Sequence, residues 1–194
     1  EVKKDDLYNF LRDMEFNRLL SQAISFYGES NSKNVISNIK QTKVSKIDTK
    51  LYKSILNEKD LDNLIDILNT KSFISIDTET SSLNPLEAEL VGISFSYAPN
   101  ESFYIPLGHK NIKGLNKDLV LKKIKSLLKD SSIKKVGQNI KYDMIVLQNN
   151  GVEIHPVEDT MLLSYVLDAG NNRHNMDTLS ELHLGHKTIS YKDV

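Results

Sequence analysis

The sequence predicts an α/β fold built on one mixed β-sheet, and three observations predict it. Residues 89–97 alternate bulky apolar with small side chains, which is typical of a strand because side chains alternate faces along it. Short β-prone segments at 72–78 and 102–107 flank this strand across tight turns. From 117 onwards, helical spacing of apolar residues alternates with further strands. This order predicts an antiparallel meander followed by parallel strands, with helices on the faces of the sheet.

The N-terminal region differs in composition from the rest. Residues 6–26 place apolar side chains at helical spacing, which predicts one long or two short amphipathic helices with Asp5 or Asp6 as N-cap and Gly28 after the end. From 29 to 46 the chain is rich in Ser, Asn and Lys, as linkers are. We therefore expect an N-terminal helical appendage and linker over 1–42 and a main domain over 43–194.

The main domain shows helix start signals at Asn57 and Asn116, since an Asn side chain can accept a hydrogen bond from the first turn. Besides the three strands above, we expect an edge strand at 47–53, helices at 58–69 and 117–129, a strand at 133–138, a helix at 140–149, a strand or extended piece up to Pro156, and helices at 160–167 and 176–184.

The composition excludes several kinds of site. The 194 residues carry 25 basic and 26 acidic side chains, so a nucleic acid would be held in a local groove and not by the whole surface. There is no cysteine, which excludes disulfides, thiolate nucleophiles and cysteine-ligated zinc. No apolar run is long enough to cross a membrane, and we expect no membrane partner.

Asp77 and Glu79 lie one residue apart at the end of the predicted strand 72–78. Residues at i and i+2 of a strand point the same way, so these two carboxylates should project together and repel each other. A divalent cation between them would relieve the repulsion. The alternative is an ordinary solvated strand end.

A third carboxylate, Asp143, follows a strand that gives way at Gly137 to the first turn of a helix. Strand ends and adjoining helix starts meet at ligand sites in such sheets, so Asp143 can lie beside Asp77 and Glu79. Several carboxylates together favour Mg²⁺ or Mn²⁺, as in phosphoryl-transfer sites. Taken alone, Asp143 could instead complement the helix dipole.

Six segments together resemble the proofreading 3′-to-5′ exonuclease domain of bacterial family A DNA polymerases, the DNA polymerase I type. The resemblance is collinear from about residue 43 to 194, and residues 1–30 resemble the segment that joins the preceding 5′-nuclease domain to it. The segments are D-T-E-T-S-S-L (77–83), L-V-G-I-S-F-S (90–96), Y-I-P-L (104–107), V-G-Q-N-I-K-Y-D (136–143), D-T-M-L-L-S-Y-V-L (159–167) and R-H-N-M-D-T-L (173–179).

This resemblance implies a ribonuclease H-like fold of the DEDD exonuclease superfamily and a site with two divalent cations, Mg²⁺ or Mn²⁺. Asp77, Glu79 and Asp143 match metal-binding carboxylates of the family. Leu83 matches an apolar residue that wedges at the terminal bases. The other residues that match contacts to the 3′-terminal nucleotides are Thr80, Gln138, Asn139, Tyr142 and Arg173.

The resemblance also implies partners and a location. The substrate would be a single-stranded or frayed DNA 3′ end, and polymerase and 5′-nuclease domains would be covalently linked in a cytoplasmic, nucleoid-associated protein. The family's third motif, a Tyr followed four residues later by an Asp, is absent from these residues. We therefore expect the chain by itself to be impaired.

Other interpretations remain open. The same carboxylates would serve an RNA-trimming exonuclease, and a non-catalytic scaffold could keep the fold for DNA binding or for packing against a polymerase. Leu83 could be a core residue, and Gln138, Tyr142 and Arg173 could make ordinary structural contacts. His183 and His186 have helical spacing but no third ligand nearby, which makes a zinc site the weaker interpretation.

Overall fold

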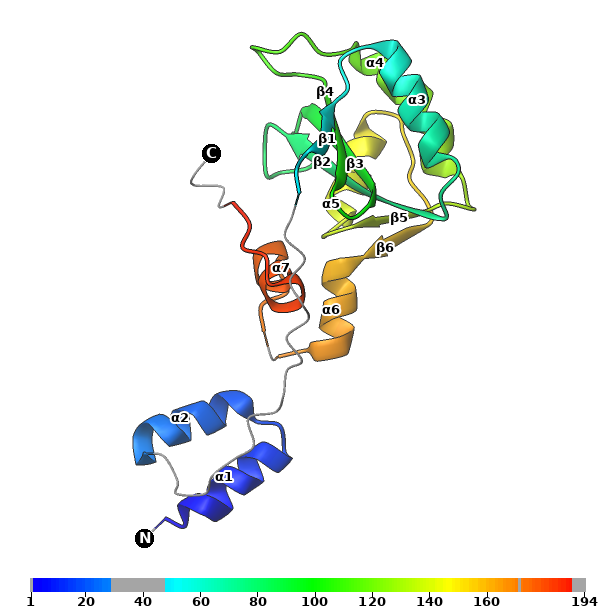
Figure 1. Cartoon of the computed structure of the whole chain (residues 1–194). Coiled ribbons are helices and arrows are strands. Elements are labelled where there is room, and N and C mark those ends of the chain that lie inside the picture. Colours follow the sequence, from blue (N-terminus) through cyan, green and yellow to red (C-terminus); the bar gives the residue numbers. More distant parts are fainter. Residues whose placement is uncertain (1, 29–47, 171, 190–194) are drawn as a thin grey trace.

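The computed structural model describes residues 2–28, 48–170 and 172–189 (Figure 1). Its main body is a six-stranded sheet with the strand order β1-β4-β3-β2-β5-β6. The strands are β1 (Leu51–Ser54), β2 (Phe73–Thr80), β3 (Leu90–Ala98), β4 (Glu101–Pro106), β5 (Lys134–Gly137) and β6 (Val157–Asp159).

The sheet is mixed, as predicted. Strands β2, β3 and β4 form an antiparallel meander, whereas β5 and β6 extend it in parallel beside β2. β1 lies at the opposite edge, parallel to β4, so the predicted edge strand is confirmed in a shorter form. Of the strand or extended piece expected up to Pro156, the strand alternative is wrong, because the last strand forms after this proline, where 157–159 align with 135–137. Proline cannot donate to a sheet, which favours a strand that begins beyond it.

Helices α3 (Glu58–Leu68), α4 (Lys117–Lys129) and α5 (Lys141–Asn149) share one core with the sheet. Along β2 the buried residues alternate strictly with exposed ones, and Ile74 and Ile76 face these helices. The other side chains of this core include Leu61, Leu64, Leu68, Ile93, Phe95, Ile105, Val120, Ile124, Leu127, Leu128, Val146 and Leu147. One face of the sheet is therefore closed by helices, and the residues between the buried ones point to the other face.

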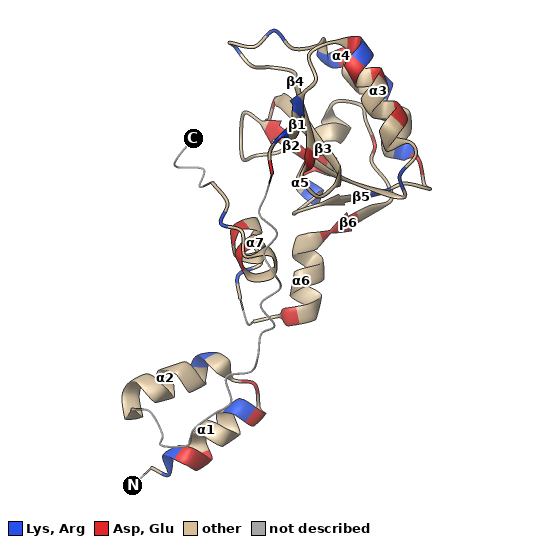
Figure 2. Ribbon diagram, in the orientation of Figure 1, with Lys and Arg blue, Asp and Glu red and all other residues tan. Residues whose placement is uncertain are grey.

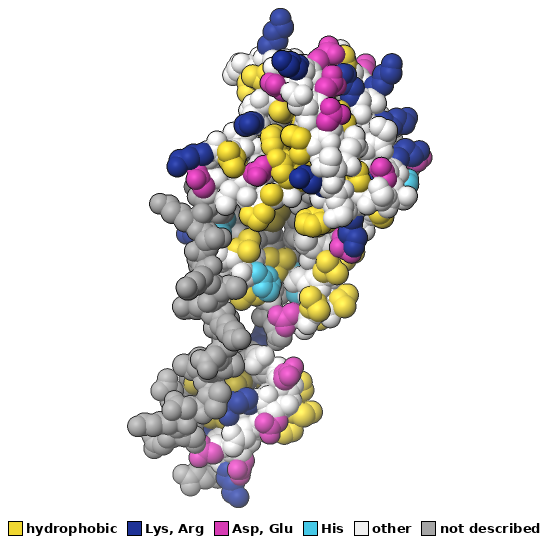
Figure 3. All heavy atoms as spheres, turned by 45° about the vertical axis from the view of Figure 1, so that its right-hand side comes forward, with side chains coloured by type: hydrophobic (Ala, Val, Ile, Leu, Met, Phe, Trp, Pro, Cys, Tyr) yellow, Lys and Arg dark blue, Asp and Glu magenta, His cyan; other side chains and the backbone are white. Residues whose placement is uncertain are grey.

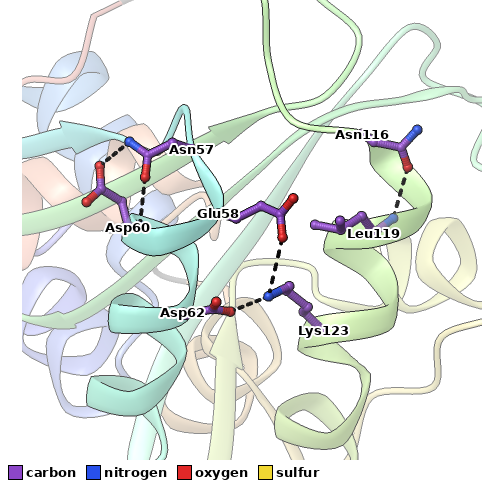
Figure 4. Close-up of polar contacts among 7 residues, drawn as sticks. All are labelled: Asn57, Glu58, Asp60, Asp62, Asn116, Leu119 and Lys123. Atoms are coloured by element: carbon purple, nitrogen blue, oxygen red, sulfur yellow. Dashed lines mark hydrogen bonds and ion pairs between the residues drawn. The ribbon is translucent and has the colours of Figure 1, made fainter.

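The predicted starts of α3 and α4 are confirmed (Figure 4). Asn57 accepts a hydrogen bond from the backbone of Asp60, and Asn116 accepts one from Leu119, both at 3.0 Å. Lys123 of α4 joins the two helices through an ion pair with Asp62 of α3 at 2.5 Å. Each cap satisfies an amide that the helix cannot, which contributes about 1 kcal/mol.

The N-terminal appendage consists of two helices, α1 (Lys4–Asp13) and α2 (Asn17–Tyr27). The predicted cap at Asp5 or Asp6 is wrong, because α1 begins earlier and both acids lie inside its first turn, where they complement the helix dipole. Gly28 ends α2 with φ of +81°, as the pattern predicted. The predicted linker 29–46 lies outside the described residues.

Helices α6 (Thr160–Asp168) and α7 (Met176–Leu184) complete the described chain. α6 carries no charge before its last residue, Asp168 (Figure 2). Over the face shown in Figure 3, basic and acidic side chains are interspersed, so this face has no patch of a single sign. No helix in the described ranges is long and apolar enough to span a bilayer.

Candidate functional site

The open face of β2 carries both Asp77 and Glu79. Asp77 pairs across the sheet with Ser94 of β3, and Glu79 pairs with Gly92. Ser94 is small and leaves room beside Asp77, whereas the space over Gly92 is filled by the Tyr104 side chain. β2 continues to Thr80, which places Asp77 and Glu79 within the strand and not at its end.

The position of Asp143 follows from where β5 stops. β5 pairs with β2 only as far as Ser75 and Val136, and the chain then turns into α5. The Asp143 carboxylate takes the place of a further strand residue: its Oδ1 accepts from the Thr78 amide at 2.8 Å and from the Thr78 hydroxyl at 2.6 Å. A residue 65 positions along the chain is thereby fixed against β2 next to Asp77.

The carboxylates perturb one another. The pKa of Asp77 is raised from 3.8 to about 6. Burial is the largest cause, and the charges of Asp143 and Glu79 supply the rest of the rise. Burial also raises the pKa of Asp143, although the two hydrogen bonds from Thr78 oppose this and Asp159 adds to it. Asp77 and Asp143 are thus harder to ionise than solvated aspartates, mainly because of burial, and a bound cation would favour their charged forms.

A pocket of about 210 Å³ adjoins Asp77 on the open face. Its walls come from the sheet, from the end of β5 and from the starts of α6 and α7. The lining residues are Ser75, Ile76, Asp77, Ser94, Phe95, Ser96, Ser102, Val136, Gly137, Gln138, Thr160 and Met176. The pocket therefore offers a small, concave space directly beside a perturbed carboxylate.

Within the described ranges, no three Asp, Glu or His side chains are gathered closely enough to hold a metal ion. Asp77 and Asp143 come together, and Glu79 lies one position further along the same face. The chemistry of these donors suits a hard divalent cation, because carboxylate oxygens are the ligands that Mg²⁺ and Mn²⁺ prefer. The metal role of the three acids stays a prediction, and the same finding gives no support to zinc at His183 and His186.

Two of the expected substrate contacts are engaged within the protein. Gln138 donates from its amide to the His174 carbonyl at 2.7 Å and accepts from the Thr160 hydroxyl at 2.5 Å. The backbone amide of Asn139 donates to the Asp159 carboxylate at 3.0 Å, and the Asn139 backbone has a φ of +55°. These bonds tie the loop between β5 and α5 to α6.

The remaining expected contacts are Thr80, Leu83, Tyr142 and Arg173. Thr80 and Tyr142 join their hydroxyls at 2.5 Å. Leu83 is 97% exposed, so the core alternative for it is wrong, and Arg173 is exposed as well. Leu83 and Arg173 are thus the expected contacts whose side chains reach furthest into solvent.

Sequence reasoning missed several residues of this region. Thr78 holds Asp143, and Asp159 caps α6 by accepting from Met161 and Leu162. An Asp directly before an apolar helical run is a recognisable cap signal, but the pairing of Thr78 with Asp143 depends on the fold and has no local signal.

Tyr104 was also missed as a neighbour of Glu79. A Cβ on Gly92, the cross-strand partner of Glu79, would lie 1.9 Å from the Tyr104 hydroxyl, so the ring covers this glycine. The hydroxyl bonds His109 Nε2 at 2.6 Å, and burial followed by the Glu79 charge raises the pKa of Tyr104. Only the pairing of β3 with β4 brings these residues together.

Comparisons with known proteins show the family of this chain. The family described as 3′-5′ exonuclease matches residues 52–194. Because the match covers most of the chain, the protein belongs to this family of exonuclease domains.

Curated relatives confirm the resemblance to the exonuclease domain of bacterial DNA polymerase I. The chain is 42% identical to DNA polymerase I of Borreliella burgdorferi over 154 residues, which are 78% of this chain and 17% of that protein. It is 34% identical to the Pseudomonas aeruginosa enzyme over 200 residues, covering 100% of this chain and 21% of that protein. The chain thus spans about a fifth of the length of these relatives.

Solved structures share the fold. Escherichia coli RNase D, an exoribonuclease, superposes with a TM-score of 0.59 at 20% identity, covering 73% of this chain and 35% of that one. Brucella melitensis NrnC with bound Mg²⁺ gives a TM-score of 0.53 at 27% identity, covering 72% and 63% of the two chains. The six-stranded mixed sheet with its helices is therefore a ribonuclease H-like fold, as the resemblance implied.

Proposed function

We propose that this chain is a metal-dependent 3′-to-5′ exonuclease domain that removes nucleotides from single-stranded or frayed DNA 3′ ends. The observation that carries the proposal is the placement of Asp143 against β2 beside Asp77, with Glu79 on the same strand. A solvated strand end would not need a third, buried acid at this position. The relatives at 34–42% identity are DNA polymerases, which favours DNA as the substrate.

Asp77, Glu79 and Asp143 would hold two Mg²⁺ or Mn²⁺ ions. When bound, such ions neutralise charge on the phosphate and make a water molecule easier to deprotonate. Thr78 keeps the Asp143 carboxylate turned toward β2 through its two hydrogen bonds. The fit of the donors is supported by their chemistry and by the raised pKa of Asp77, which burial causes first and the charges of Asp143 and Glu79 increase.

The reaction is hydrolysis of the terminal phosphodiester. A bond forms from water oxygen to phosphorus, the bond from phosphorus to O3′ breaks, and a proton passes to the departing O3′, releasing a nucleoside 5′-monophosphate. Leu83 and Arg173 are the exposed side chains proposed to contact the terminal nucleotides. Contacts of stacking and charge make such binding tolerant of sequence.

In the longer protein we propose that 1–42 forms the junction with a 5′-nuclease domain and that a polymerase domain is covalently linked to 43–194. The share of the relatives covered by this chain supports linked domains. Such a protein would act on chromosomal DNA in the cytoplasm. Since the third exonuclease motif is absent from these 194 residues, we propose that this chain cuts more slowly than a polypeptide that contains the motif.

The test uses a 5′-labelled single-stranded DNA with Mg²⁺ or Mn²⁺, the 194-residue chain, and a polypeptide extended through the third motif. We expect stepwise shortening by the extended polypeptide and its loss after Asp77→Ala. Asp66→Ala is the matched control, because Asp66 is an exposed acid of α3, a helix that packs against the face of the sheet opposite to Asp77. An extended polypeptide that leaves the DNA intact, or an Asp77→Ala variant of full activity, would overturn the proposal.

The same assay separates the alternatives. RNA trimming, suggested by the shared fold with RNase D, would appear as faster shortening of an RNA oligonucleotide than of DNA of the same sequence. A scaffold would retain single-stranded DNA without cutting it in either polypeptide. Calorimetry with Mn²⁺ distinguishes the scaffold further, because binding heat that disappears in Asp77→Ala is expected only of a metal site.

A further inference from the structure

The segment between β2 and β3 presents two large apolar side chains to solvent. Leu83 is 97% exposed and Leu86 is 73% exposed. The base of this loop is closed by two hydrogen bonds between Ser81 and Glu89, each of 3.0 Å. The loop, defined here as residues 81–89 and called the Leu83 loop, is therefore an ordered unit and not a loose connection.

Internal bonds also shape the tip of the Leu83 loop. Asn84 accepts from the Leu86 amide at 3.2 Å through its side chain and from the Glu87 amide at 3.1 Å through its carbonyl. The Asn84 amide in turn donates to the Ser82 hydroxyl at 3.1 Å. With its own turn satisfied, the loop needs only a few outside contacts to hold one position.

The polar contacts that reach the loop from outside come from β2, where the Thr80 hydroxyl donates to the Ser82 carbonyl at 3.2 Å, and from α5. The Tyr142 hydroxyl donates to the Ser82 carbonyl and shares a hydrogen bond of 2.5 Å with the Thr80 hydroxyl. The first turn of α5 is thus hydrogen-bonded to the beginning of the loop. At the other end Asn149, seven residues later and so on the same side of the helix, donates to the Pro85 carbonyl at 3.0 Å.

Tyr142 precedes Asp143 in the chain, so the residue that grips the loop stands on the same helical turn as the buried acid. Asp143 is bound to Thr78, and Tyr142 is bound to Thr80 two residues further along β2. A movement of this turn would shift the acid and the Leu83 loop together. The two contacts therefore fix the distance between the apolar side chain that the loop presents and the carboxylates on β2.

We propose that Tyr142 is a positioning residue whose hydroxyl latches the Leu83 loop to the turn of α5 that carries Asp143, so that the loop places a DNA 3′ end over the carboxylates. The role in placing DNA rests on the proposed nuclease function, whereas the latch itself does not. Geometry of this kind matters to rate because a misplacement of about 1 Å at a reacting group can cost about 100-fold.

The latch is tested on the 194-residue chain without any nuclease assay. The protein has no cysteine, so Leu86→Cys provides a single attachment point for a spin label on the exposed part of the loop. We expect Tyr142→Phe to increase the mobility of this label in the electron paramagnetic resonance spectrum. Tyr97→Phe is the matched control, since it removes a hydroxyl that is bonded to Glu101, away from the loop, and it should leave the spectrum unchanged.

The positioning role is tested in the polypeptide extended through the third motif, on a frayed duplex end. One lost hydrogen bond corresponds to about a 5- to 10-fold effect, so Tyr142→Phe should lower kcat/KM about 5- to 10-fold. Leu83→Ala should lower kcat/KM as well, and adding Tyr142→Phe to it should cause little further loss, because both changes remove the same placement.

Each outcome decides a different point. An unchanged label spectrum in Tyr142→Phe would overturn the latch, whatever the enzyme does. A mobile label together with full activity, or with losses that multiply in the double variant, would overturn the positioning role. A Tyr142→Phe enzyme with full activity and an immobile label would overturn both the latch and the positioning role. If the unaltered extended polypeptide does not cut DNA, the nuclease proposal fails while the latch is still judged by the label.

Discussion

Successive side chains of the central strands point to opposite faces of the sheet, and the two faces differ: one forms the hydrophobic core and the other carries the candidate site. On β3, Ile93 is completely buried against the helices while its neighbour Ser94 points to the open face beside Asp77. On β2, Ile76 and Thr78 belong to the buried face and Asp77 lies between them on the other. A single strand therefore supplies the packed core and the candidate site at once.

This difference shows how a repulsive group of acids can be kept in a stable fold. Burial of apolar side chains on one face contributes roughly 25 cal/mol per Å² of surface removed from water. The crowded carboxylates on the other face oppose folding, as the raised pKa of Asp77 indicates. Because the strand is held from its helix-covered face, the open face is available for chemistry that costs stability.

The largest effect expected from breaking this arrangement is on activity. Asp77→Asn keeps the size of the side chain but removes a charge that we propose binds metal, and such a charge is worth several kcal/mol in metal-dependent sites. We expect the extended polypeptide to lose about 10³-fold in its rate of shortening single-stranded DNA. Circular dichroism should show an unchanged fold, and a variant that keeps a tenth of the activity would contradict the role of Asp77.

The next effect separates the two faces by stability. Ile93→Ala leaves a cavity in the core and should lower the free energy of unfolding by about 3 kcal/mol, whereas Ser94→Ala should change it by less than about 0.5 kcal/mol. Urea unfolding of both variants measures the difference. Similar losses for these adjacent positions would show that the open face is covered in solution.

A smaller effect is expected at the point where the faces meet. Thr78→Val removes the hydroxyl bond to Asp143 but keeps the amide bond. We expect a loss of about 1–2 kcal/mol of stability and a further rise in the pKa of Asp143, because a hydrogen bond to the ionised form is gone. Chemical denaturation and NMR titration of the carboxyl would measure these changes. A pKa that falls would contradict the assigned bond.

The smallest effect concerns pH and metal. Asp77 has a folded pKa of about 6 against an ordinary 3.8, so its contribution to stability is full below 3.8 and lost as the pH rises through 6. Without metal, Asp77→Asn should therefore raise Tm by about 2–4 °C at pH 7 and not at all at pH 3.5. Mg²⁺ should raise the Tm of the unaltered chain but not of the variant. Calorimetry at the two pH values tests the sign.

Much of the fold was predictable because local patterns agree with the final packing. The caps at Asn57 and Asn116, the meander and the helices at 58–69 and 117–129 depend on short-range bonds and on periodicity. The cap expected at Asp5 or Asp6 was wrong because acidic residues favour both the cap and the first turn. The last strand was misplaced because its partner, β5, is distant in sequence.

Lys135 shows why some positions resist prediction. A lysine in a strand suggests a solvated edge, yet this side chain is completely buried and donates to the carbonyls of Asp130 and His155 at 2.6 and 2.8 Å. The two carbonyls come from separate turns that meet only in the folded chain. Burial lowers the pKa of this amine, as expected where two neutral acceptors replace water.

The sequence by itself determined the class of fold, the two acids on β2 and the candidate third acid, because alternation and motif spacing are local properties. Only the tertiary structure decided that Asp143 is bound to Thr78, that Gln138 and Tyr142 hold neighbouring segments, and that Leu83 projects from a closed loop. The reason is physical, because each of these contacts joins segments that are distant along the chain. In addition, a backbone amide of β2 is left for a side chain to bind only where the neighbouring strand has ended.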